Sequence, residues 1–201
     1  MIGYFRIVNA LYWLALIVWS AALISAGVAA MNVFGTLDAM PLELQRYAAY
    51  PVDEHPRLAA GHIMEGVFFL VDVLQFIAAP ITVLALIAQF VFFRVPFRRL
   101  SNILRAAALV IAAGLFAYHA TMVAPEMNRE LRLFWSAAEA GRIEEAAEHR
   151  RAFNACHPTA DAILRLNLLL LLIAAGASAV ALTPAPDRRD SFLEPPRLLE
   201  S

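Results

Sequence analysis

The chain has 201 residues, of which 61% are hydrophobic and 16% are charged, and its formal net charge is −1. A mean hydropathy of +0.65 is typical of a membrane protein. The near-neutral charge and the lack of a basic arm exclude bulk attraction to nucleic acid. The length suits one compact four-helix bundle and leaves no room for a separate soluble domain.

Four long apolar stretches set the predicted architecture. They lie at residues 11–34, 67–93, 106–125 and 166–182, and each is close to the roughly 20 residues that a spanning helix needs. The first stretch stays uncharged from residue 7 to residue 37. This exceeds the roughly 7 to 15 apolar residues of a signal peptide, so we expect a retained span. The prediction is an all-α, integral membrane four-helix bundle formed by residues 1–183.

Small residues recur at helical spacing within two of these spans. Ala22, Ala26 and Ala30 do so in the first span, and Ala108 and Ala112 in the third. Small side chains at that spacing let helices approach closely in lipid. We expect them to pack within the bundle, and a face between copies of the chain is the alternative.

The connections between the spans differ in character. The first, residues 35–60, contains several prolines and is predicted to be an irregular loop. The third stays helical to Ala140, where Gly141 supplies a stop and residues 142–154 form another helix rich in Ala and Glu. We therefore expect a helical hairpin that projects beyond the lipid. The proline-containing tail, residues 184–201, is predicted to be disordered.

The positions of arginine predict the topology. The short second connection holds Arg94, Arg98 and Arg99, with Arg105 just beyond it, and short loops rich in Arg usually stay in the cytoplasm. The third connection also carries Arg, accompanied there by many Glu residues. We expect a multi-pass protein of a prokaryotic inner membrane, with both termini in the cytoplasm and the hairpin outside.

Ionisable side chains gather towards the outer end of the predicted bundle. Counting about 1.5 Å per residue from the inner boundary places Asp72, Glu126 and Arg165 near the outer interface. An unpaired charge near lipid costs free energy. We therefore favour a structural charge cluster in which Arg165 pairs with Asp72 or Glu126.

A metal site is the second interpretation of the outer polar residues. Facing helices of bundle proteins supply metal ligands, and the candidates for copper or zinc here are His62, Glu65, His157 and Asp161. Haem is a further alternative, since residues 153–157 read Phe-Asn-Ala-Cys-His, which contains half of a haem attachment motif. The first Cys of that motif is missing, and we expect no cofactor.

His119 is the titratable side chain that the same count places deepest in the lipid zone. It is the best candidate for a polar-substrate or proton pathway entered from outside. The structural alternative is that its ring donates a hydrogen bond to a backbone carbonyl, or to Ser25 or Asn32 of the first span.

Several short motifs resemble a known family. Residues 122–127 read Met-Val-Ala-Pro-Glu-Met, a charged hairpin follows, and Phe-Asn-Ala-Cys-His at 153–157 leads into Leu-Asn-Leu at 166–168. With the glycines at 61 and 66 before the second span, this pattern is similar to the transmembrane protein 205-like family, whose bacterial members carry a domain of unknown function. The resemblance implies a four-span fold. By analogy with metal-handling relatives, it adds weight to a metal role.

The sequence contains no catalytic triad, no phosphate loop and no acid pair at catalytic spacing, so we expect a non-enzymatic protein. The predicted role is an accessory or structural subunit of a larger membrane complex. The alternative is a small metal-binding or transport protein with its polar site at the outer mouth of the bundle. The expected partners are the lipid bilayer and either a membrane-protein complex or a second copy of the chain.

Overall fold

The computed structural model describes residues 2–182, and every regular element in this range is helical. Four of the described helical segments are long and apolar enough to cross a membrane. The predicted all-α, four-helix membrane bundle is therefore confirmed. The predicted disordered tail, residues 184–201, lies outside the described residues.

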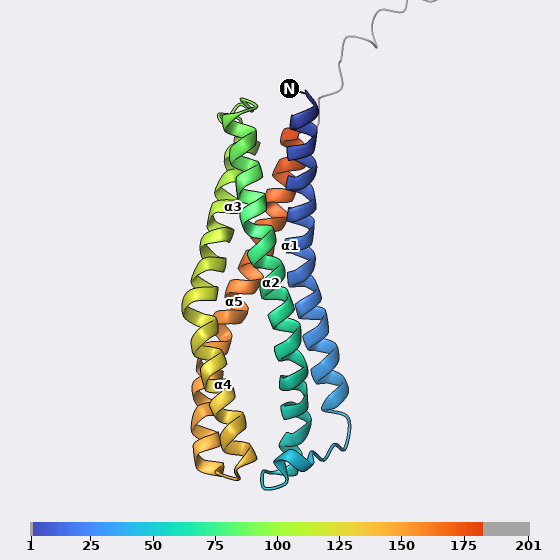
Figure 1. The fold of residues 1–201 in the computed structure, drawn as a ribbon, viewed down its shortest axis with the longest axis vertical. Helices are drawn as coiled ribbons and strands as arrows, with labels where there is room; N and C mark the ends of the chain where they lie inside the picture. The colour runs from blue at the N-terminus through green and yellow to red at the C-terminus, as the bar shows by residue number, and fades with distance from the viewer. Residues whose placement is uncertain (1, 183–201) are drawn as a thin grey trace, which may run out of the picture.

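The long helices run in alternating directions. α1 (Ile2–Leu37) leads through two short 3₁₀ turns, η1 (Gln45–Tyr47) and η2 (Val52–Glu54), into α2 (His55–Val91). α3 (Leu100–Tyr118), the π-helical turn η3 (His119–Val123) and α4 (Ala124–Glu139) follow one another without a break, and α5 (Ile143–Leu182) returns beside them. Figure 1 shows that the start of α1 and the last turn of α5 lie at the same end of the molecule, which we call the termini end.

The helices are much longer than a bilayer requires. They contain 36 to 40 residues, or about 54 to 60 Å, whereas the hydrocarbon core is about 30 Å thick. We call residues 38–66 and 126–160, which lie away from the termini end (Figure 1), the crown. A membrane border at the termini end would leave the crown outside the hydrocarbon core. The first connection, residues 38–54, is shorter than predicted because α1 continues to Leu37 and α2 already begins at His55.

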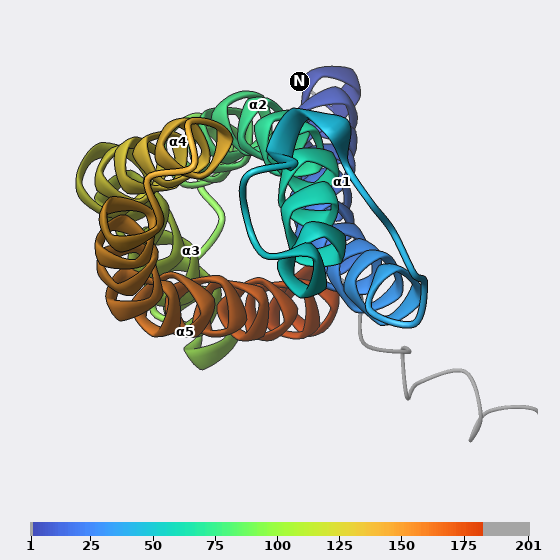
Figure 2. The same cartoon turned by 90° about the horizontal axis from the view of Figure 1, so that it is seen from below.

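Aromatic and small side chains fill the core of the bundle. Tyr12, Leu16 and Trp19 of α1 are almost completely buried. α1 packs along α2, and α5 packs along α3 and α4, as Figure 1 and the end view in Figure 2 show. Close packing is possible because the small residues predicted to lie at helix contacts are mostly buried there: Ala22, Ala26, Ala108 and Ala112.

The crown has a hydrophobic core of its own, formed by Tyr47, Tyr50, Leu58, Phe134, Trp135 and three alanines. His55, fully buried at the start of α2, ties the first connection to this core. Its Nδ1 accepts the backbone N–H of Leu44 at 2.9 Å, and its Nε2 lies 2.9 and 3.1 Å from the carbonyl oxygens of Tyr47 and Tyr50. One imidazole ring thereby holds three backbone groups in place.

The turn between α4 and α5 occurs at the glycine that the sequence predicted. Gly141 has a φ of +69°, in the left-handed region that disfavours residues with a Cβ. A Cβ built at this position would lie 2.9 Å from the Cβ of Ala49. Backbone conformation and space therefore both require glycine at this turn.

Replacing Gly141 with alanine is expected to lower the melting temperature of the detergent-solubilised protein. The left-handed backbone alone costs about 1 to 2 kcal/mol, which corresponds to a fall of about 2 to 8 °C, and the contact with Ala49 adds to it. Gly66→Ala is the matched control, because nothing lies within 4 Å of a Cβ there and alanine favours the helix. Equal falls in both variants would contradict this account of the turn.

Candidate functional site

His62, one of the predicted metal ligands, is occupied by contacts within the crown. Its Nε2 lies 2.6 Å from the hydroxyl of Tyr47, and its ring lies against the indole of Trp135 with 3.9 Å between the ring centroids. Burial, followed by the charge of Arg46, lowers the pKa of His62 below its ordinary value. The hydrogen bond between the Tyr47 hydroxyl and the His62 ring ties η1 to α2.

The other three predicted metal ligands contact residues outside the predicted set. Glu65 pairs with Arg132 of α4 at 3.2 Å, and Asp161 pairs with Arg165 at 2.8 Å. His157 is exposed and lies beside the ring of Phe153, one turn earlier on α5. Within residues 2–182 no group of three or more His, Cys, Asp and Glu side chains is placed to hold a metal ion. The proposed site of His62, Glu65, His157 and Asp161 is not assembled in this structure.

The predicted cluster of Asp72, Glu126 and Arg165 is replaced by pairs within single helices. Arg165 binds Asp161 four residues earlier on α5, and Glu126 binds Arg129 at 2.6 Å on α4. Residues three or four apart on a helix are neighbours, so these contacts form without bringing two helices together. Asp72 makes no hydrogen bond or ion pair in the described part of the chain.

Other charges of the crown are paired between its elements. Arg150 of α5 binds Glu54 of η2 at 2.7 Å. Glu130 of α4 lies 2.8 Å from Nδ1 of His149 and 2.9 Å from the guanidinium of Arg129. The hydrogen bond from His149, together with Arg129, holds the pKa of Glu130 below its ordinary value. These pairs join the turns and helices of the crown.

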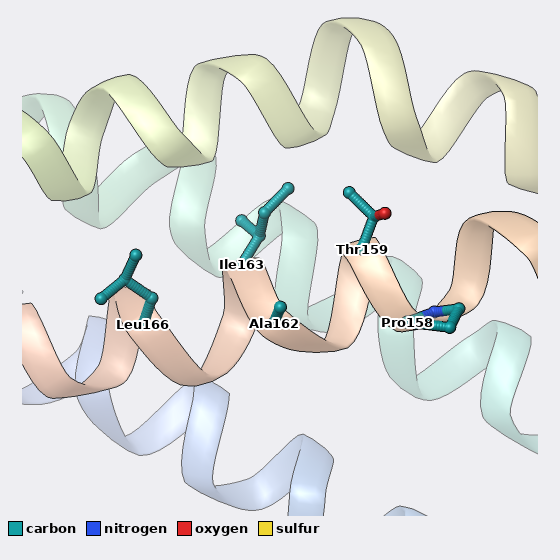
Figure 3. Close-up of a pocket in the computed structure, with 5 residues that line it drawn as sticks. All are labelled: Pro158, Thr159, Ala162, Ile163 and Leu166. Atoms are coloured by element: carbon teal, nitrogen blue, oxygen red, sulfur yellow. The ribbon is translucent and has the colours of Figure 1, made fainter.

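A shallow groove of about 360 Å³ lies along α5 at the border between crown and bundle. It is lined by Pro158, Thr159, Ala162, Ile163 and Leu166. Figure 3 shows Thr159 and Ile163 extending toward the helix that passes alongside α5. The lining is almost entirely apolar and carries no charge, so this groove offers no recognition of a polar ligand.

The polar groups that lack partners lie inside the bundle. Ten buried side-chain nitrogen and oxygen atoms of residues 2–182 have no hydrogen-bond partner, and none of the ten belongs to the crown. They come from Asn9, Gln75, Gln89, Asn102, Arg105, His119 and Asn167. A buried polar group without a partner is costly and calls for an explanation, so we take these residues as the candidate site.

Three of them form a crown-side polar level. Gln75 of α2, His119 of η3 and Asn167 of α5 are 92% or more buried, and helix counting places them about 22 to 29 Å from the termini end. The Gln75 carbonyl accepts the indole N–H of Trp19 at 3.1 Å, while its Nε2, His119 Nδ1 and Asn167 Oδ1 remain unpaired. His119 therefore lacks the predicted hydrogen bond to Ser25 or Asn32. The side-chain amide of Asn32 donates to the backbone carbonyl of Val28 instead.

The remaining four form a termini-side polar level. Asn9, Gln89, Asn102 and Arg105 lie within about 11 Å of the termini end by the same count. Gln89 and Arg105 are 0% exposed and Asn102 is 1% exposed. Beside them, the hydroxyl of Tyr12 on α1 is paired with Ser178 of α5 at 2.6 Å, so all four long helices contribute polar atoms to this end of the bundle.

A mostly apolar layer separates the two polar levels. Its polar side chains, Tyr12 and Thr82, have hydroxyls bonded to Ser178 and to the carbonyl of Ala78. Leu109 of α3 and Leu171 of α5 are completely buried, at about 14 and 17 Å from the termini end. Ala112 and Ala174 are also completely buried. Ala112 lies about one turn nearer the crown than Leu109, and Ala174 lies about one turn nearer the termini end than Leu171. The interior of the bundle thus alternates between polar and apolar zones.

Sequence reasoning identified His119 but missed the rest of this site. Arg105 was used only as a topology marker, and the uncharged amides were passed over. The sequence does contain a signal for these amides, because Gln75, Gln89 and Asn167 interrupt otherwise apolar stretches. Polar side chains at membrane depth cost free energy and often mark a functional site.

Comparison with protein-family models, with curated proteins and with solved structures finds no match for this chain. The resemblance to the transmembrane protein 205-like family stays a prediction.

Acidification is expected to weaken the crown through His62. Because folding lowers the pKa of His62 below its ordinary value of 6.5, the unfolded chain takes up a proton first as the pH falls. The stabilising effect of the neutral ring is present above that value and is lost progressively as the pH decreases through the folded pKa. The melting temperature of the wild type should therefore fall more steeply below about pH 6.5 than that of His62→Gln, which keeps an acceptor but does not titrate. Parallel pH curves for the two proteins would contradict this assignment.

Proposed function

We propose that this chain is a non-enzymatic, multi-pass membrane protein that binds a small polar solute inside its four-helix bundle, with the crown on the outer side of a prokaryotic inner membrane. The observation that carries the proposal is the distribution of unpaired polar atoms. In the described residues all of the buried unpaired polar atoms lie in the bundle, whereas several charges of the crown are paired with one another.

The arrangement supports transport or binding better than simple cohesion of helices. Polar side chains that only hold transmembrane helices together do so by bonding across the interface, as Trp19 does with Gln75 and Tyr12 with Ser178. The unpaired atoms of Gln75, His119 and Asn167 make no hydrogen bond between helices. They provide both hydrogen-bond donors and acceptors, the equipment with which a pocket orients a polar ligand.

The two polar levels and the apolar layer between them also fit a solute-handling bundle. The crown-side level is built from neutral amides and an imidazole, and the termini-side level contains a cation. Polar residues that face the interior of a bundle commonly mark substrate or ion pathways. The buried side chains of Leu109 and Leu171 lie between the levels and would hinder a polar solute from passing from one level to the other.

The role of Asn167 is tested by comparing the melting temperatures of two variants with substitutions on α5. If Asn167 is a solute contact that is unpaired in the empty protein, Asn167→Leu should raise the melting temperature, because it removes a buried polar group costing about 1 to 3 kcal/mol. Ser178→Ala is the control, since Ser178 is bonded to Tyr12 and to the carbonyl of Ala174, and its loss should lower the melting temperature. A fall of similar size in both variants would make Asn167 structural.

A second function, as an accessory subunit of a membrane complex, is supported by Asp72. This partly buried carboxylate has no bonded partner in residues 2–182, and helix counting places it about 28 Å from the termini end, at the membrane border. Phe69 and Phe76 lie on the same stripe of α2 and are 71% and 59% exposed. A partner helix that carries a cation would satisfy the carboxylate and cover the rings.

The accessory function predicts a stoichiometric partner after extraction of native membranes in a mild detergent. Asp72→Asn should lose that partner, as read by mass spectrometry of the purified sample. Asp161→Asn should keep it, because the Asp161 carboxylate is already occupied by Arg165. Retention of the partner by Asp72→Asn, or the absence of any partner from the wild type, would count against the accessory function.

A further inference from the structure

We propose that Arg105 is the anion-recognition residue of the bundle, and that the termini-side polar level takes a small oxyanion of the phosphate type. This inference rests on the proposed function, because it names the class of solute that one of the two polar levels would bind. It is carried by an unpaired buried cation, by the absence of internal counter-charge in the described residues, and by the unpaired acceptors at the same level of the bundle.

The guanidinium of Arg105 is completely buried, and its Nε, Nη1 and Nη2 atoms have no hydrogen-bond partner in the described part of the chain. Its central carbon lies 5.8 Å from the centroid of the Tyr12 ring and 5.2 Å from that of Phe90. Aromatic rings interact with the flat face of a guanidinium, whereas its five N–H groups point outward in its own plane. The aromatic contacts therefore leave the hydrogen-bonding edge of Arg105 free.

No carboxylate of the described residues lies near Arg105. Within residues 2–182 every Asp and Glu belongs to the segments 38–72 and 126–161, which form the crown and its border with the bundle. Helix counting separates Asp72 from the level of Arg105 by about 20 Å. A buried cation needs a counter-charge or hydrogen-bond acceptors, so its negative partner comes from outside the described bundle.

The amides at the same level of the bundle as Arg105 favour an oxyanion over a halide. Asn102 donates its amide to the carbonyl of Pro96 at 2.7 Å, but its Oδ1 is unpaired, as are Asn9 Oδ1 and both polar atoms of Gln89. A guanidinium fork matches the paired oxygens of a phosphate or carboxylate. The unpaired acceptors require a ligand that also donates, and a protonated phosphate has both kinds of group.

The surface beside this level is suited to attract anions. The connection between α2 and α3 carries Arg98 and Arg99, both exposed, and clustered cations raise the local concentration of anions. Because Arg105 is 0% exposed, the site is occluded in this structure, and a ligand enters when the termini end opens.

The test measures thermal unfolding of the full chain in lipid-free detergent, with and without inorganic phosphate at constant ionic strength. The wild type is expected to gain at least about 2 °C in saturating phosphate, because a ligand that binds only the folded state stabilises it. Arg105→Met should lose this gain and, without a buried unpaired charge, should melt no lower than the wild type in the absence of phosphate. Arg98→Met is the control for surface adsorption and should retain the full gain.

A second variant and a lipid comparison complete the design. Arg105→Lys keeps the charge but loses the planar fork, so its apparent affinity for phosphate should fall at least severalfold. Reconstitution in phosphatidylcholine vesicles with and without phosphatidylglycerol distinguishes a free anion from a lipid headgroup. A rise in melting temperature with phosphatidylglycerol but not with inorganic phosphate would assign the site to a lipid phosphate, which Arg105 would bind through the same guanidinium groups.

The inference is overturned if neither probe stabilises the wild type, if Arg105→Met gains as much as the wild type, or if Arg98→Met loses the gain as well. It is also overturned if phosphate acts only after Asp187, Asp190, Glu194 and Glu200 are changed to amides, since the counter-charge would then come from the chain itself. None of these results bears on Asn167 at the other polar level. The Asn167→Leu comparison therefore shows separately whether the proposed function also fails.

Discussion

Helices about twice as long as the hydrocarbon core is thick are the constraint on which this structure depends. A spanning helix of about 20 residues would end at the lipid border, but these helices have 36 to 40 residues. The residues beyond that length must be solvated and packed, and we infer that they form the crown. A second hydrophobic core around Trp135 and a set of ion pairs such as Arg150 with Glu54 follow from that length.

The two halves of the molecule treat polar groups in opposite ways. In the crown, several charged side chains are paired between neighbouring elements. In the bundle, water is excluded and an unpaired group costs more, yet amides, an imidazole and a guanidinium are left without partners. Among the described residues, the buried polar side-chain atoms without a partner all belong to the bundle and none belongs to the crown. This inversion is the main reason to look for function within the bundle.

Local features of the chain were predictable and long-range pairing was not. The apolar runs predict the four spans because lipid permits few alternatives, and Gly141 predicts its turn because a positive φ is a property of one residue. The partner of Arg165 was predicted wrongly, since a neighbour four residues away on the same helix was available. The contact of His62 with Trp135 and the burial of Arg105 depend on which helix faces meet, and a single sequence does not encode that in any local pattern.

The hydrogen bonds of His55 give one part of the crown surface a fixed shape. The connection between α1 and α2 contains prolines and few helical residues, so its sequence resembles a flexible peptide. The buried ring of His55 instead fixes its backbone at Leu44, Tyr47 and Tyr50. A molecule that approaches this part of the crown meets a conformational epitope that exists only in the folded protein, and a linear peptide of the same sequence would not reproduce its shape.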